Sequence, residues 1–264
     1  LNLSYNKLTE IPAKIGLLKR LDSLFLSGNK LKKISVEIYK LTQLIVLHIS
    51  SNKLTFIPDE IFQLTQLKVL NLSYNKLTEI PAKIGLLTQL DSLFLSINEL
   101  KKIPIEIFNI KQLKELHLSF CRLACIPAEI GQLTQLEVLD LSSNPFTHIS
   151  SHVSQLKQLR TLSLKDNKLT KIPAEIFQLA QLEILELSCN NLTKLPAEIC
   201  QLKKLRLLVL SGNELAEIPA EIGQLTQLKK LDLSHNKLAI IPMEIGQLQQ
   251  LRFLFINNNK LIQL

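Results

Sequence analysis

A constant spacing of 23 residues runs through the whole chain. Residues 67–77 read LKVLNLSYNKL, a pattern of the form L-x-x-L-x-L-x-x-N-x-L. The pattern recurs through twelve slots over the 264 residues, without insertion or deletion. Because one such unit cannot bury its apolar face alone, a chain with this period must fold as a stack of equivalent units.

One position in each unit is an asparagine, apart from a single cysteine. The twelve positions are Asn6, Asn29, Asn52, Asn75, Asn98, Cys121, Asn144, Asn167, Asn190, Asn213, Asn236 and Asn259. An asparagine amide both donates and accepts hydrogen bonds, so it can satisfy backbone groups that stacking buries. We therefore predict a structural ladder along these positions.

The residues around each ladder position predict a strand and a short helical turn. In residues 136–144, LEVLDLSSN, Leu139 and Leu141 alternate with Val138 and Asp140, so the leucines point inward from a short strand. A constant step stacks such strands in parallel, about 4.8 Å apart. The I-P-x-E-I-G-x-L segment that follows predicts one helical or 3-10 turn, since proline suits a helix start. We expect one domain, residues 1–264.

Composition and charge limit the classes of protein to consider. Hydrophobic residues make up 46% of the chain and charged residues 20%, as in ordered proteins. No apolar run approaches the roughly 18 residues that a transmembrane segment needs, so none is expected.

The formal net charge is +8, and many lysines directly follow a ladder asparagine: Lys7, Lys30, Lys53, Lys76, Lys168, Lys237 and Lys260. This lysine row is either a solvated edge or a stripe for an acidic partner or an anionic surface. Nucleic acid is not expected as a partner, because no stacking aromatics interleave with the row.

The outward strand positions are the most informative about function, because their side chains are not needed to pack the core. The central outward position holds Phe25, His48, Phe94 and His117 in the first half of the chain. We call these four residues the aromatic strip. Exposed aromatics are costly unless a partner covers them, and they dominate binding hot spots.

Further along the chain, the same position becomes acidic and is expected to set electrostatic selectivity. The full set of candidate partner-binding residues is Phe25, His48, Asn71, Tyr74, Phe94, His117, Phe120, Asp140, Glu186 and Asp232.

The sequence offers no constellation for catalysis, a metal or a cofactor. Asp140, Glu186 and Asp232 are expected on alternate strands, about 10 Å apart, too far to share a proton or a metal ion. Cys121 and Cys125 lack a second pair that would complete a metal site. We therefore predict no catalytic residues, no metal site and no cofactor.

The repeat at Asn213–Leu228, NELAEIPAEIGQLTQL, resembles 23-residue leucine-rich repeat proteins. These include the Ras-suppressor-like intracellular group and the eukaryote-like leucine-rich repeat proteins of bacterial pathogens such as Legionella and Leptospira. The resemblance implies an α/β repeat solenoid, a leucine-rich repeat horseshoe of about twelve repeats. Its parallel sheet would be concave, with short helical or 3-10 turns on the convex side.

The near-identical repeats, rich in Lys, Ile and Gln, are more similar to the bacterial group, whose members are often effectors or exposed proteins that engage host or bacterial proteins. We expect a non-enzymatic protein-binding module, monomeric, that binds a host or bacterial protein as an effector or effector regulator. The alternatives are an anionic-surface or nucleic-acid binder using the lysine row, or the recognition part of a larger enzyme. Since no disulfide caps are seen, we expect a cytoplasmic protein or one secreted into a host cell.

Overall fold

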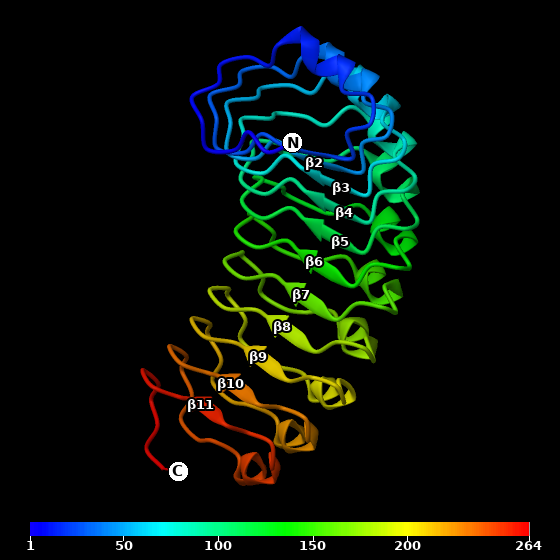
Figure 1. Ribbon diagram of the computed structural model, residues 1–264. Helices are drawn as coiled ribbons and strands as arrows, with labels where there is room; N and C mark the ends of the chain where they lie inside the picture. The colour runs from blue at the N-terminus through cyan, green and yellow to red at the C-terminus, as the bar shows by residue number, and fades with distance from the viewer. Residues whose placement is uncertain (264) are drawn as a thin grey trace. The chain divides into compact units, whose positions relative to one another are not determined.

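The computed structural model describes residues 1–263. The chain forms two compact units, Leu1–Leu123 and Ala124–Leu264, called unit 1 and unit 2 below. Each unit is a stack of repeats in which a short strand alternates with a short helix (Figure 1). The expectation of one domain over residues 1–264 stays a prediction.

Five strands stack in parallel in unit 1, each paired with the next at a step of 23 residues. Leu47, for example, lies opposite Leu70. Before the first strand, Asn2 forms an isolated bridge to Phe25. The strands are β1 (Ser23–Phe25), β2 (Val46–His48), β3 (Val69–Asn71), β4 (Ser92–Phe94) and β5 (Glu115–His117).

Six further strands stack in unit 2 with the same parallel register. Leu162, for example, lies opposite Leu185. The strands are β6 (Val138–Asp140), β7 (Thr161–Ser163), β8 (Ile184–Glu186), β9 (Leu207–Val209), β10 (Lys230–Asp232) and β11 (Phe253–Phe255).

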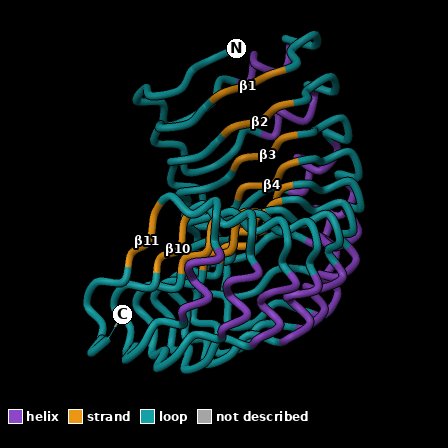
Figure 2. The backbone as a smooth tube through the Cα atoms, turned by 90° about the horizontal axis from the view of Figure 1, so that it is seen from below, coloured by secondary structure: helices purple, strands orange, loops and turns teal. Residues whose placement is uncertain are grey.

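Every helix of residues 1–263 is a five-residue 3-10 helix, and no α-helix occurs in that range. In each unit these helices form a row separate from the strands (Figure 2). Unit 1 holds η1 (Ala13–Leu17), η2 (Val36–Lys40), η3 (Asp59–Gln63), η4 (Ala82–Leu86) and η5 (Ile105–Asn109). Unit 2 holds η6 (Ala128–Gln132), η7 (Ser151–Gln155), η8 (Ala174–Gln178), η9 (Ala197–Gln201), η10 (Ala220–Gln224) and η11 (Met243–Gln247). The predicted repeat solenoid of parallel strands and short 3-10 turns is confirmed.

The alternation of residues along each strand separates the core from a solvent face. In β3, Leu70 is buried, whereas Val69 and Asn71 are half-buried on the other side of the strand. The equivalent leucines of β1 to β10 are buried as well, while Leu254 of β11 is 38% exposed. The side of the strands opposite these leucines is called the solvent face below.

The helix η4 illustrates how the I-P-x-x-I-G segment winds. Pro81 precedes it with φ fixed at −59°, and the Pro81 carbonyl accepts a hydrogen bond from the N–H of Ile84 at 3.0 Å. This bond spans three residues, as a 3-10 turn requires. A Cβ on Gly85 would lie 2.8 Å from the carbonyl oxygen of Glu106, so only glycine lets the next repeat approach this closely.

The ladder asparagines join each repeat to the one before it. The Asn75 Oδ1 accepts a hydrogen bond from the N–H of Leu54 at 3.0 Å, and its Nδ2 donates to the carbonyls of Ile49 and Leu72 at 3.0 Å each. Leu54 and Ile49 belong to the preceding repeat. The same three contacts recur at Asn29, Asn52, Asn98, Asn167, Asn190, Asn213, Asn236 and Asn259. For Asn6 and Asn144, Nδ2 donates to carbonyls of their own repeat.

Cys121 preserves the donor half of this pattern. Its Sγ donates to the carbonyl of Leu95 at 3.3 Å, the position that an asparagine Nδ2 reaches in other repeats. A thiol has no equivalent of the amide oxygen, and the neighbouring backbone differs accordingly. Lys101 and Arg122 adopt φ of 55° and 60°, and the Lys101 N–H donates to the Cys121 carbonyl at 3.1 Å.

The residue before each ladder position adopts a left-handed backbone conformation. We call these positions the turn slots: Tyr5, Gly28, Ser51, Tyr74, Ile97, Phe120, Ser143, Asp166, Cys189, Gly212, His235 and Asn258. Glycine enters this region freely, but a β-branched side chain is strained there. Ile97, with φ of 57°, is therefore the least suited residue of the set.

Replacing Asn75 by alanine should destabilise the chain strongly. The change leaves the buried Leu54 N–H without a partner, which costs about 1–3 kcal/mol. It also removes one hydrogen bond, worth about 0.5–1.5 kcal/mol, from each of the Ile49 and Leu72 carbonyls, which keep the bonds from Asn52 and Asn98. We expect a loss of roughly 2–5 kcal/mol in denaturant unfolding. Asn109 is exposed and serves as the control, since Asn109→Ala should change stability by less than about 0.5 kcal/mol. Equal effects at the two asparagines would contradict the structural role of the ladder.

Replacing Ile97 by glycine should stabilise the chain by about 1 kcal/mol, because glycine relieves the left-handed strain. Valine keeps the β-branch, so Ile97→Val should stay within about 0.5 kcal/mol of the original chain. The denaturant midpoint measures both changes. A lower midpoint for Ile97→Gly than for Ile97→Val would show that the turn slot is not strained.

Candidate functional site

The last residues of strands β1 to β5 form one continuous row on the solvent face of unit 1. Strand register places them side by side in the order Phe25, His48, Asn71, Phe94 and His117. All five are half-buried. The aromatic strip is thus divided by Asn71 into two pairs, each with one phenylalanine and one histidine.

Each pair makes a direct ring contact. The ring centres of Phe25 and His48 lie 5.1 Å apart with an edge-on geometry, and those of Phe94 and His117 lie 4.7 Å apart and are stacked. The phenylalanines are therefore less exposed than the sequence predicts, because the neighbouring histidine covers part of each ring. Such contacts also limit ring motion, so the pairs present a fixed aromatic surface.

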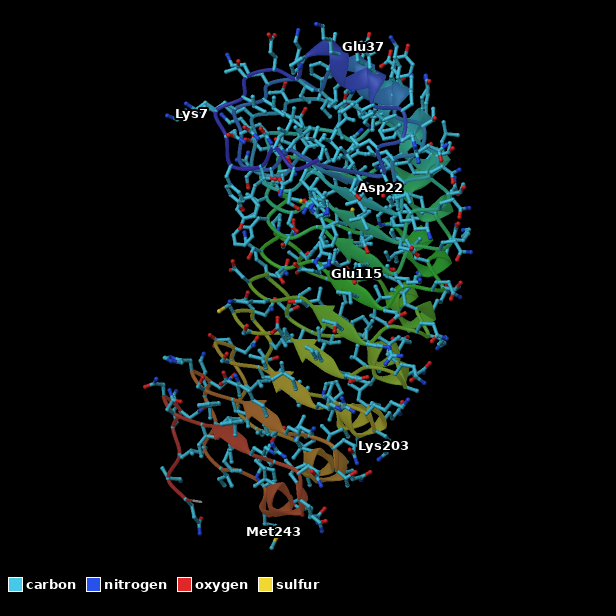
Figure 3. All side chains as sticks on the ribbon, in the orientation of Figure 1. Lys7, Asp22, Glu37, Glu115, Lys203 and Met243 are labelled. Atoms are coloured by element: carbon cyan, nitrogen blue, oxygen red, sulfur yellow. The ribbon has the colours of Figure 1, made fainter. Side chains whose placement is uncertain are left out.

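The two histidines have different surroundings. Desolvation lowers the pKa of His48 below its ordinary value of 6.5, so its ring is neutral near pH 7. The His117 Nε2 lies 3.9 Å from Oε2 of Glu115, a residue of the same strand. Glu115 lies on the strand side of unit 1 (Figure 3).

Asn71 supports the end of its own strand. Its Oδ1 accepts a hydrogen bond from the N–H of Ser73 at 3.0 Å, the local turn that asparagine and aspartate favour. Asn2 accepts the same bond from Ser4 at 3.0 Å. Sequence reasoning did not predict this role, although an N-x-S or D-x-S triplet at the strand end signals it.

The acidic candidates of unit 2 use the same turn and are linked through serines. The Asp140 Oδ1 accepts from the N–H and the Oγ of Ser142, at 3.0 and 2.7 Å. The Ser142 Oγ lies 2.7 Å from the Ser163 Oγ, which donates to Oε2 of Glu186 at 2.9 Å. Asp140 and Glu186 are therefore connected by hydrogen bonds through Ser142 and Ser163 on the solvent face.

Asp232 lies on β10, and its Oδ1 accepts from the N–H and Oγ of Ser234 at 3.0 and 2.6 Å. It repeats the geometry of Asp140 and is not one of the residues in the hydrogen bonds that connect Asp140 to Glu186. The three acidic candidates thus divide into a linked pair and one separate residue.

A row of alternating charges runs beside these residues, at the start of the unit 2 strands. Arg160 Nε lies 3.3 Å from Glu137 Oε2, and Arg160 NH1 lies 3.2 Å from Glu183 Oε1. Arg206 NH1 then lies 3.0 Å from Glu183 Oε2. Opposite charges alternate along this row, so the pairs neutralise one another across successive repeats.

Tyr74 and Phe120 do not lie on the strands. They occupy turn slots three residues beyond the ends of β3 and β5, and are 56% and 53% exposed. The four rings of the aromatic strip are half-buried, so Tyr74 and Phe120 are the most exposed rings among the candidate residues.

The lysine row lies along the turn edge, directly after the ladder. All seven of its side chains are exposed. Lys7 projects outward from this edge (Figure 3). Lys237 forms an ion pair with Glu214.

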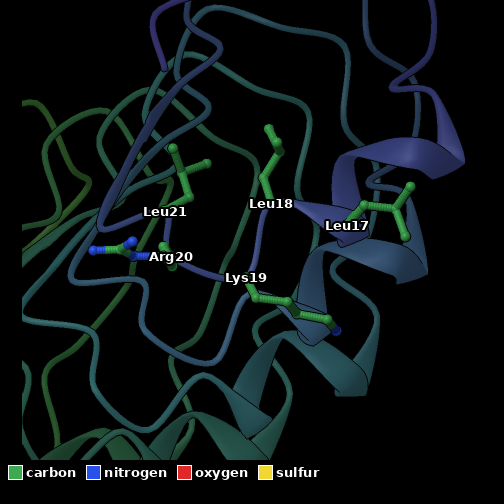
Figure 4. A pocket seen from close by; sticks show the side chains of 5 residues that line it. All are labelled: Leu17, Leu18, Lys19, Arg20 and Leu21. Atoms are coloured by element: carbon green, nitrogen blue, oxygen red, sulfur yellow. The ribbon is translucent and has the colours of Figure 1, made fainter.

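Two cavities of unit 1 lie away from the aromatic strip. One, of about 570 Å³, is lined by Leu17, Leu18, Lys19, Arg20 and Leu21 (Figure 4). Another, of about 620 Å³, lies among the loops before η3, η4 and η5 and includes Phe56 and Glu79. No strip residue lines either of these two cavities.

No helix within residues 1–263 is both long and apolar enough to cross a membrane. The four cysteines Cys121, Cys125, Cys189 and Cys200 are free. Within the described range, no three His, Cys, Asp or Glu side chains gather as metal ligands would.

Family models match most of the chain. A leucine-rich repeat region model matches residues 56–151 and 138–257, and a leucine-rich repeat model matches residues 43–64. A search of curated protein sequences found no match.

Solved structures of leucine-rich repeat proteins superpose closely. A Leptospira interrogans protein of this kind is 39% identical with a TM-score of 0.84, covering 97% of this chain and 71% of its own. The Arabidopsis receptor kinase HAESA is 30% identical with a TM-score of 0.83, covering 98% and 46%. InlJ of Listeria monocytogenes is 27% identical with a TM-score of 0.81, covering 100% and 59%.

This chain therefore spans less than two thirds of HAESA and of InlJ. The family models cover more than half of its length, and the Leptospira protein is similar over nearly all of it. The chain belongs to the leucine-rich repeat family.

Proposed function

We propose that this chain is a non-enzymatic protein–protein interaction module that binds its partner on the solvent face of the sheet. The observation that carries the proposal is the pair of Phe–His contacts on unit 1, at 5.1 and 4.7 Å. They stand on neighbouring strands above a core of buried leucines.

The physical basis is the energy available from covering fixed aromatic rings. Half-buried phenylalanine still offers apolar surface to a partner, and aromatic residues are enriched among interface hot spots. The ring contacts and the short strands hold these side chains in place, so binding requires little further ordering. Phe25 and Phe94 are the proposed anchors, with His48 and His117 beside them.

Asp140, Glu186 and Asp232 are proposed to set electrostatic selectivity. The serine contacts hold the first two carboxylates in a defined orientation. Charges placed this way favour a complementary partner and repel a partner of like charge more than they add affinity.

The biological setting is proposed from the comparisons. The similar proteins of Leptospira and Listeria support a bacterial module. We propose that it engages a host or bacterial protein, as an effector or effector regulator. HAESA was solved with the peptide hormone IDA, which supports a polypeptide partner. We further propose that residues 1–264 act as one monomeric domain, in the cytoplasm or inside a host cell.

A second candidate function is binding to an anionic surface or nucleic acid through the lysine row, which is exposed along its length. Such binding would weaken steeply with salt, because each neutralised phosphate releases counterions. Measuring partner capture over a range of salt concentrations distinguishes binding through the lysine row from binding through the aromatic strip.

Combined replacement of Phe25, His48, Phe94 and His117 by alanine should weaken partner capture about a hundredfold or more, since hot-spot truncations cost about 2 kcal/mol or more each. The measurement is affinity capture from host and bacterial lysates with quantification of the bound protein. Gln43→Ala with Gln66→Ala, two exposed positions of unit 1, is the control and should leave capture unchanged. Unchanged capture by a folded quadruple variant would reject the strip as the site.

Capture should weaken as the pH falls below the ordinary histidine pKa of 6.5. Burial already lowers the pKa of His48, and a covering partner would lower it further. The free chain then binds more protons than the complex, so affinity falls as the pH drops through the lowered His48 pKa. His48→Asn should flatten this dependence, measured from about pH 7 to pH 5. An equal pH slope in the original chain and the variant would contradict the prediction.

A further inference from the structure

Three consecutive turn slots of unit 1 carry apolar side chains. Tyr74, Ile97 and Phe120 have φ of 55°, 57° and 53°. Tyr74 and Phe120 are 56% and 53% exposed, and Ile97 is half-buried. We call these three residues the turn ridge.

The backbone of the ridge is held by neighbouring repeats, whatever the side chains are. The Tyr74 N–H donates to the Ser96 carbonyl at 2.8 Å, and the Ile97 N–H donates to the Ser119 carbonyl at 2.7 Å. Hydrogen bonds to the next repeat thus fix the left-handed backbone of the ridge. A strained conformation persists when the surrounding structure holds it in this way. The side chains themselves are not needed to form the turns.

Several turn slots elsewhere use residues that tolerate this conformation, although Tyr5 and Cys189 do not. Asp166, Gly212 and Asn258 are examples from unit 2. Large apolar residues at a left-handed position are unfavourable for folding and, when exposed, unfavourable for solubility. Strained positions cluster at binding sites, so the ridge calls for a functional explanation.

The chain contains an internal comparison for the ridge. Residues 1–18 and 70–87 are identical, so Tyr5 corresponds to Tyr74. The next two slots of that first block hold Gly28 and Ser51, where the ridge holds Ile97 and Phe120. The turns of Ile97 and Phe120 therefore form with small residues one block earlier, so these two side chains are not needed to form the turns.

Positive charge lies beside the ridge. Lys76 follows the slot of Tyr74 by two residues and continues the lysine row through Lys53, Lys30 and Lys7, all exposed. None of these four lysines makes an ion pair within the described residues. The next positions of the row, Glu99 and Arg122, pair with each other at 3.3 Å. The edge of unit 1 is thus apolar along the ridge and cationic along the row.

We propose that the turn ridge is a second part of the interaction surface and takes an acidic, apolar segment of the partner protein. Apolar side chains of the segment would cover Tyr74, Ile97 and Phe120, and its carboxylates would face the lysine row. The ridge lies three residues beyond Asn71, Phe94 and His117 on the same repeats, so one partner can reach both. The inference rests on the proposed function of the solvent face.

The test uses synthetic peptides of about 12 residues, enough to cross several repeats when extended. One set combines leucine and phenylalanine with glutamate, a second combines them with lysine, and a third has glutamate and serine without apolar residues. A single-stranded oligonucleotide of similar length is included. The inference predicts tightest binding to the first set; a preference for the second or third set or the oligonucleotide, or equal or no binding throughout, overturns it.

The decisive variant transfers the first block's residues to the ridge, as Ile97→Gly with Phe120→Ser. It should bind the acidic, apolar peptides about tenfold or more weakly, while its denaturant midpoint rises because the strain is relieved. Lys53→Ala with Lys76→Ala should also weaken this binding and remove the preference for glutamate over lysine. Unchanged binding by the ridge variant overturns the inference.

The strip variant separates this inference from the proposed function. If the ridge variant binds normally and the strip variant loses lysate capture, the inference fails and the proposed function stands. If the ridge variant loses peptide binding and the strip variant captures normally, the ridge stands as a binding surface and the strip does not.

Discussion

The hydrogen bonds of the ladder asparagines are the interaction on which the rest of the structure depends. Asn75 satisfies a backbone N–H and a carbonyl of the preceding repeat together with a carbonyl of its own. Without Asn75 the buried Leu54 N–H would lack a partner, and each of the two carbonyls is shared with the ladder asparagine of an adjacent repeat. Since the bonds recur every 23 residues, they hold the strands in register and fix where every solvent-face side chain lies.

A fixed register has consequences for the surface. It brings Phe25 beside His48 and Phe94 beside His117, although the members of each pair are 23 residues apart in sequence. It also imposes the left-handed turn slot, so the residue placed there affects stability as well as surface chemistry. Ile97 and Phe120 are strained in this left-handed conformation, and they add apolar surface to the turn edge. The same two residues therefore lower the stability of unit 1 and contribute to its proposed binding surface.

The sequence predicts the repeat, the strands and the inward leucines, because these follow from side-chain periodicity alone. It does not predict the contacts that depend on backbone angles. The Asn71 hydrogen bond to Ser73 and the φ of Ile97 are of this kind. The partial burial of Phe25 and Phe94 was also missed, because it arises from rings that touch across strands. Tyr74 and Phe120 were predicted as site residues, but their place on the turn edge emerges only from the structure.

Hydroxyl-radical footprinting of the chain, free and bound to its captured partner, tests the central claim most directly, because it reports the solvent access of individual rings. Phe56, which is 52% exposed and lies before η3, away from the strip, is the internal reference. We predict that Phe25 and Phe94 lose reactivity in the complex while Phe56 keeps it. Protection of Phe56 with unchanged reactivity at Phe25 and Phe94 would contradict it.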